Sequence, residues 1–146
     1  MINAKFSCIY CDDVRREDGG KSSYMGVYED SIIFSEPSGH RPLFAFILKL
    51  VLPIKEDISD VNFELTDDSN LNIGATLSKK EIQELKIKIL ASMPDSDVVT
   101  MKCVIQLGAI VFESQQKIRS FVKFNDQTIE GESLRVIFMN PDQEIK

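Results

Sequence analysis

The feature that most constrains this chain is an apolar run from Phe44 to Leu52 with a repeat of two residues. One face of this segment carries only large apolar side chains, and the other face is apolar as well, apart from Lys49. A strand that is apolar on both sides usually lies in the middle of a layered structure. The run is too short to cross a bilayer as a helix, which needs about 20 residues. It therefore predicts a buried central strand that ends at Pro53.

Other segments alternate in the same way, and turn residues separate them. They recur every ~8–12 residues, a spacing typical of an all-β sandwich or barrel. We expect an antiparallel β-sandwich of about eight strands, built as one domain over residues 1–146. The charged stretch 12–20 is expected to be a connection, and the proline-flanked stretch 36–42 a loop. The remaining strand candidates are 4–11, 21–28, 31–34, 61–66, 71–75, 98–107, 110–112, 117–124 and 134–139.

The segment from Ser78 to Met93 supports two interpretations. Ser78 followed by Glu81 has the form of a capping box, in which each side chain satisfies a free amide at a helix start. Ile82, Leu85, Ile89 and Met93 also fall at helical spacing. Residues 85–89, however, alternate as a strand does. The sequence predicts a short helix near residues 79–86 and leaves a following strand open.

Three segments resemble a known family. They are residues 9–28, with the acidic turn, Gly20-Lys21 and an apolar-Gly-apolar step; the Pro42-Leu43 entry into the apolar strand; and the closing hairpin through residues 118–136. On these segments the chain resembles a family of small, functionally uncharacterised bacterial and phage proteins. The resemblance implies a β-sandwich similar to C2 or immunoglobulin-like domains. It implies no activity, since a fold alone does not supply one.

Composition bears on the compartment and on the class of partner. The N-terminus lacks a basic stretch followed by an apolar one, so we expect no signal peptide. Three cysteines, an odd number, together with no secretory signal favour a reducing, cytoplasmic setting. Lys plus Arg is 17 and Asp plus Glu is 23, which gives a net charge of −6. Phosphates repel such a chain, so general nucleic-acid binding is not expected. A membrane association is not expected either, because the longest apolar run is too short to cross a bilayer.

The cysteines form the first candidate site. Cys8-x-x-Cys11 has the spacing of a zinc knuckle or a redox pair, and Cys103 and His40 are the only obvious additional ligands. In an extended segment, however, residues i and i+3 point to opposite faces. We therefore expect structural thiols and assign no metal or cofactor here.

Clusters of carboxylates form the second candidate site. Loops at one end of C2-like sandwiches can gather such groups around calcium, which takes six to eight oxygen ligands. The spacing fits no EF-hand, and Arg15 and Arg16 would neutralise the first cluster. Solvated turns are the favoured interpretation. The carboxylates are those of Asp12, Asp13, Glu17, Asp18, Asp57, Asp60, Asp67 and Asp68.

Catalytic and cofactor motifs are also missing from the sequence. His40 is the only histidine, and a serine triad would have to use it with Ser35 or Ser38, which are near only in sequence. There is no nucleophile elbow, P-loop or dinucleotide fingerprint. We expect no enzymatic activity and assign no catalytic residue.

Basic and aromatic side chains complete the candidates. Charges along exposed strands commonly discourage edge pairing, and we favour this interpretation over a nucleic-acid site. The aromatic residues could anchor a partner or belong to the core. The basic residues are Lys79, Lys80, Lys86 and Lys88, then Lys117, Arg119 and Lys123, and the aromatic residues are Tyr24, Tyr28 and Phe44.

These observations lead to a functional hypothesis. The chain is expected to be a non-enzymatic, cytoplasmic protein-binding module, with a phage or mobile-element protein that binds or inhibits a host factor as a sub-case. The first alternative is a self-assembling structural protein of a virion or an oligomer, because sandwich edges can pair between copies. The second alternative is a calcium- or zinc-dependent module or a hydrolase. The expected partner is another protein, and homo-oligomerisation is left open.

Overall fold

A computed structural model describes residues 3–35, 39–69 and 71–139. Within these residues the chain forms thirteen strands and one helix, α1 (Lys79–Ser92). The strands are β1 (Lys5–Cys11), β2 (Asp13–Glu17), β3 (Lys21–Met25), β4 (Ser31–Phe34), β5 (Gly39–Arg41), β6 (Phe44–Pro53), β7 (Val61–Thr66), β8 (Asn72–Leu77), β9 (Val98–Leu107), β10 (Ile110–Phe112), β11 (Gln116–Phe124), β12 (Gln127–Glu130) and β13 (Leu134–Phe138).

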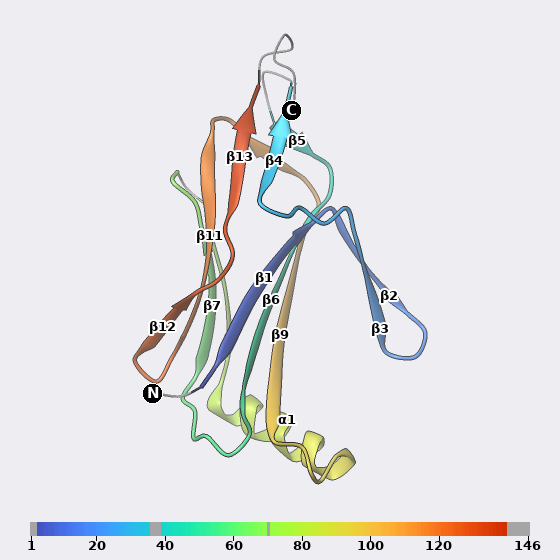
Figure 1. Ribbon diagram of the computed structural model, residues 1–146, viewed down its shortest axis with the longest axis vertical. Helices are drawn as coiled ribbons and strands as arrows, with labels where there is room; N and C mark the ends of the chain where they lie inside the picture. The colour runs from blue at the N-terminus through green and yellow to red at the C-terminus, as the bar shows by residue number, and fades with distance from the viewer. Residues whose placement is uncertain (1–2, 36–38, 70, 140–146) are drawn as a thin grey trace.

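Two larger sheets form the body of the molecule (Figure 1). The first has the order β1-β6-β9, and both of its pairings are antiparallel. The second has the order β4-β13-β11-β7-β8, with β12 paired to β11. Its pairings are antiparallel except that β13 runs parallel to β4. The prediction of an all-β, sandwich-like fold is confirmed, with this one parallel pair added.

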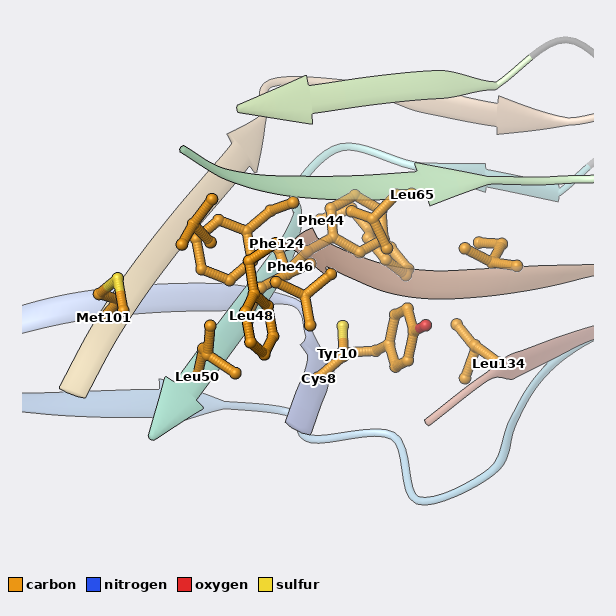
Figure 2. Close-up of a cluster of buried hydrophobic side chains, with 14 of the residues drawn as sticks. Cys8, Tyr10, Phe44, Phe46, Leu48, Leu50, Leu65, Met101, Phe124 and Leu134 are labelled. Atoms are coloured by element: carbon orange, nitrogen blue, oxygen red, sulfur yellow. The ribbon is translucent and has the colours of Figure 1, made fainter. Parts of the chain in front are cut away.

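The main core lies between the two sheets (Figure 2). Strand β6 is central, as predicted, and its even-numbered side chains from Phe44 to Leu52 are all buried in this core. Burying one such side chain stabilises the fold by about 1.5–3 kcal/mol. The core residues labelled in Figure 2 come from both sheets: Cys8, Tyr10, Phe44, Phe46, Leu48, Leu50, Leu65, Met101, Phe124 and Leu134.

A smaller cluster explains why β6 is apolar on its other face. Ala45 and Ile47 are buried there together with Cys11 of β1. Val14 and Tyr24 pack on this cluster from the β2–β3 hairpin. The hairpin therefore covers the first half of the outer face of β6. Lys49 lies further along that face and is exposed.

Several expectations about local structure were wrong. The expected connection 12–20 contains β2, which pairs with β3 as a hairpin, and only the turn around Gly19 and Gly20 matches the expectation. The expected loop 36–42 contains β5, which pairs with β10 from far along the chain, while residues 36–38 lie outside the described part. The described residues form thirteen strands rather than about eight, and the short β2, β5 and β12 are strands that were not predicted.

The ambiguous segment is a helix throughout. Ser78 forms the predicted capping box: the Glu81 amide donates to Ser78 Oγ at 3.2 Å, and the Ser78 amide donates to Glu81 Oε1 at 3.5 Å. The helix continues to Ser92 rather than ending near residue 86, and no strand follows within this segment. Ile82 is buried in the core. No helix in the described part of the chain has the length and apolarity that a bilayer span requires.

Candidate functional site

The cysteines do not share a site. Cys8 lies in the main core and Cys11 in the smaller cluster on the other face of the sheet, as the i, i+3 spacing predicts. Cys103 lies in β9, and Leu48 separates it from Cys8 across the sheet. All three are free thiols.

Burial also makes these thiols poor nucleophiles. Desolvation raises the pKa of Cys8 to about 12, although hydrogen bonds with Tyr10 and Ser120 oppose the shift. It raises the pKa values of Cys11 and Cys103 as well. The thiolate is the form that reacts and binds metals. A thiol that keeps its proton at neutral pH therefore acts as a small apolar side chain that packs in the core.

The carboxylates are dispersed over the molecule, and no group of three or more possible metal ligands occurs among the described residues. Most of these carboxylates accept hydrogen bonds from nearby residues or form ion pairs with them. Asp60 Oδ1 accepts from the Lys79 amide at 2.8 Å, and Asp57 Oδ1 lies 3.6 Å from Lys79 Nζ. Asp67 accepts from the Leu71 amide at 2.8 Å, and Asp12 accepts from the Tyr28 hydroxyl. These contacts lie at turns and strand ends.

An open cleft of about 730 Å³ lies where the loop after β6 meets the β11–β12 turn. Its lining includes Asp57, Ser59, Asp60, Lys79 and Asn125. Asn125 is itself bound on three sides: its amide donates to Ser59 Oγ, its Oδ1 accepts from the Ser59 amide, and its Nδ2 donates to the Asp57 carbonyl. The polar groups of the cleft thus hold the two loops together.

His40 lies in β5 opposite Val111, and its side chain is exposed. No serine or carboxylate of the described residues hydrogen-bonds to it, and Ser38 lies outside that part. The neighbouring Arg41 has its guanidinium carbon 5.2 Å from the centre of the Phe34 ring. The described geometry around His40 therefore supports no triad.

Several of the basic residues are buried or paired with acidic groups. Lys86 is buried, and its Nζ donates to the Glu56 carbonyl at 2.5 Å. Lys123 pairs with Glu64 at 3.1 Å, and Arg119 lies 3.9 Å from Glu130. Two of the three basic residues on β11 are thus paired with acidic side chains.

The aromatic candidates support the fold. The Tyr28 ring stacks on Phe44 with centroids 5.7 Å apart, and Phe44 is buried in the core. Tyr24 packs on the small cluster, with Lys102 Nζ 5.4 Å from its ring centre. Each ring therefore has an intramolecular packing role.

The exposed apolar side chains of α1 and its C-cap are the feature that the sequence analysis missed. Ile87 is 67% exposed, Leu90 41% and Met93 54%, and we call these three residues the α1 apolar surface. Met93 falls at helical spacing with Ile82, but it is the C-cap residue and is exposed. Ile87 and Leu90 are apolar residues outside the set at that spacing, and this was the signal available in the sequence.

Comparisons with known proteins add no relative. No family model, no curated protein and no solved structure matches this chain.

Proposed function

We propose that this protein is a non-enzymatic binding module that contacts another protein through the α1 apolar surface. The observation that carries the proposal is the exposure of Ile87, Leu90 and Met93 together. Single exposed apolar residues are common on protein surfaces, but a group of them rimmed by polar residues marks an interaction site.

The inner face of α1 shows why this group is unusual. Ile82 is buried in the core, and Leu85 and Ile89 pack against it. The helix therefore already has the apolar face that folding requires, and Ile87 and Leu90 add a second one. Burial of this second face by a partner would gain about 25 cal/mol per Å² of apolar area.

The surroundings of this surface fit a protein partner. Lys80, Glu84 and Lys88 are exposed positions on the same helix. A mixed polar rim around an apolar centre is the usual composition of a protein interface. An interface of this kind needs no cofactor and no catalytic group.

Cytoplasmic location is part of the proposal, and three free thiols support it because disulfides form in oxidising compartments. The sub-case of a phage or mobile-element protein that binds a host factor rests on the resemblance in the strand, turn and hairpin segments. The net charge of −6 supports a protein rather than a nucleic acid as the partner.

Affinity capture with a charged variant tests this proposal. The wild-type protein and the double variant Ile87→Glu/Leu90→Glu are used as baits in lysate of the source cell, and the captured proteins are quantified by mass spectrometry. We expect a stoichiometric partner on the wild-type bait and at least a tenfold loss on the variant, because two buried glutamates each cost several kcal/mol.

The matched control adds two glutamates elsewhere, with Ser22→Glu/Thr128→Glu at exposed strand positions. The control should retain the partner, and all three baits should unfold at similar temperatures. Equal capture by the wild type and the α1 variant would contradict the proposal.

Self-assembly remains the second candidate, and the edge of β9, which pairs only with β6 among the described residues, favours it. The calcium, zinc and hydrolase alternatives stay hypotheses without a site among the described residues.

A further inference from the structure

Strand β9 forms one edge of the first sheet, and among the described residues it pairs only with β6. The pairing extends from Phe44 opposite Leu107 to Pro53 opposite Val98. Natural proteins usually shorten, cover or charge such edges, because free backbone groups invite pairing with another chain. Strand β9 is long, and Lys102 is its only charged residue.

The hydrogen-bond pattern identifies the backbone groups at this edge. The Ile54 amide donates to the Asp97 carbonyl at 2.9 Å, so residue 97 faces β6. Because antiparallel residues alternate in direction, the odd-numbered residues of β9 bond to β6 and the even-numbered ones face outward. Ser96 Oγ donates to the Val98 carbonyl, which leaves Thr100, Lys102, Val104 and Gln106 with free backbone edge groups among the described contacts. The side-chain amide of Gln106 donates to Asp13 Oδ1 and to the Val14 carbonyl on the outer face.

The opposite edge of the same sheet is capped at two positions. On β1, the Cys8 amide donates to Glu132 Oε2 at 2.6 Å. The Tyr10 carbonyl accepts from the Tyr28 amide at 2.8 Å. The two edges therefore differ, and β9 is the one open to a further strand.

The side chains of β9 indicate that its edge lacks a neighbour. Val99 and Met101 are buried, but Cys103, Ile105 and Leu107, on the same inward face, are only half-buried. These three side chains pack against the main core from the margin of the sandwich. A strand added beside β9 would cover them.

We propose that the added strand is β9 of a second copy, paired antiparallel about a twofold axis at Cys103. Opposite residues in a sheet point to the same face, so odd residues must face odd ones. Two antiparallel registers of β9 against β9 of the second copy meet this condition and pair nearly the whole strand. One centres on Lys102 and sets two lysines opposite each other, which repel.

The register centred on Cys103 avoids this repulsion. It sets Lys102 opposite Val104, Met101 opposite Ile105 and Val99 opposite Leu107. The inward apolar residues of both copies then form one continuous face. The two Cys103 residues meet as a non-hydrogen-bonded pair, with Cα atoms about 4.5 Å apart, a spacing at which a disulfide can form. This inference uses a different surface from the α1 proposal and stands independently of it.

Light scattering with two matched lysine variants tests the inference. Val104 and Thr100 both lie on the outer face of β9, each two residues from Lys102. In the proposed register, Val104→Lys faces Lys102 of the second copy twice per dimer, whereas Thr100→Lys faces Gln106. We expect the wild type and Thr100→Lys to reach twice the 16.5 kDa monomer mass. Val104→Lys should weaken dimerisation about tenfold, the effect of two like-charge pairs.

Oxidation of the wild type with diamide provides a second readout. Diamide takes two electrons and two protons from a pair of thiols, which join as a disulfide. We expect a covalent dimer whose linked peptides both contain Cys103, and no dimer from Cys103→Ser. A monomeric mass at all concentrations without this crosslink, or equal weakening by both lysine variants, would overturn the inference.

Discussion

Gly26 is the residue at which the backbone depends most clearly on the absence of a side chain. Its φ is +66°, in the left-handed region that favours glycine. A Cβ built there would lie 2.3 Å from Asp12 Oδ2. The same Asp12 accepts from the Tyr28 hydroxyl, and its amide donates to the Met25 carbonyl at 2.9 Å. Gly26 thus lets the chain leave the hairpin close to Asp12.

Replacing this glycine should therefore be more costly than replacing one in an open turn. Gly26→Ala combines a strained φ with a steric clash, and we expect a loss of about 2–3 kcal/mol in the free energy of unfolding. Gly20→Ala is the matched control, because Gly20 has a φ of +73° but no atom within 4 Å of its Cβ position. It should lose only about 1 kcal/mol. Urea unfolding compares the two, and equal losses would contradict the role given to Asp12.

The buried thiol of Cys8 predicts a dependence of stability on pH. Its pKa is raised from 9.0 to about 12 in the folded protein. The folded state therefore keeps a proton that the unfolded state releases, so stability is complete below pH 9 and falls as the pH rises towards 12. The slope is at most about 1.4 kcal/mol per pH unit for one group.

Urea unfolding midpoints measured from pH 8 upward test whether stability falls as the pH rises. Cys8→Ala should reduce, without abolishing, the part of the decline that begins near pH 9, because burial also raises the pKa values of Cys11 and Cys103. Burial also raises the pKa values of Tyr10 and Tyr28. The loss of stability that begins near pH 10 should therefore remain in the Cys8→Ala variant. An identical profile in the variant would contradict the assignment to Cys8.

At the scale of elements, the strands and turns that were predicted correctly are those with a clear local sequence pattern. Strands β6, β7 and β9 carry alternating apolar residues, and the Asn125-Asp126 turn has the two positive φ values that its hairpin requires. Strand β5 was missed because its pairing comes from β10, about seventy residues further on. Strand β2 was missed because its charged residues are typical of a loop, whereas pairing with β3 satisfies its backbone.

The length of α1 shows the competition between two local signals. Residues 85–89 alternate as a strand, yet the capping box and the contacts of Leu85 and Ile89 with the core favour the helix. A capping box satisfies two amides that would otherwise lack a partner. The alternation put Ile87 at an exposed position, and this is how the α1 apolar surface arises.

The cap can be tested separately from that surface. Ser78→Ala removes the hydroxyl that accepts from the Glu81 amide, and we expect a loss of about 1 kcal/mol in the free energy of unfolding. Ser92→Ala, at the other end of α1, removes only hydroxyl bonds to carbonyls within the helix and should change stability by less than about 0.5 kcal/mol. Thermal unfolding of both variants decides, and a larger loss at Ser92 would show that the cap does not start this helix.

At the scale of the whole molecule, the sandwich separates its core from two outward-facing features. The core lies between the sheets, while the α1 apolar surface lies on the helix that connects β8 to β9, at one end of the molecule (Figure 1). Strand β9, which pairs only with β6 in the described part of the chain, begins shortly after this helix. Alternation in the sequence identified the core, but the position of β9 at the edge of its sheet depends on how the strands are ordered, which no local pattern encodes.

Site-specific photocrosslinking in the source cell tests the central claim most directly. A benzophenone amino acid replaces Ile87 in one strain and Thr128, an exposed residue on β12, in another. The account predicts one dominant crosslinked partner from position 87 and none, or far less of it, from position 128. Absence of a crosslink at position 87, or equal crosslinking from both positions, would contradict the claim that α1 carries the binding surface.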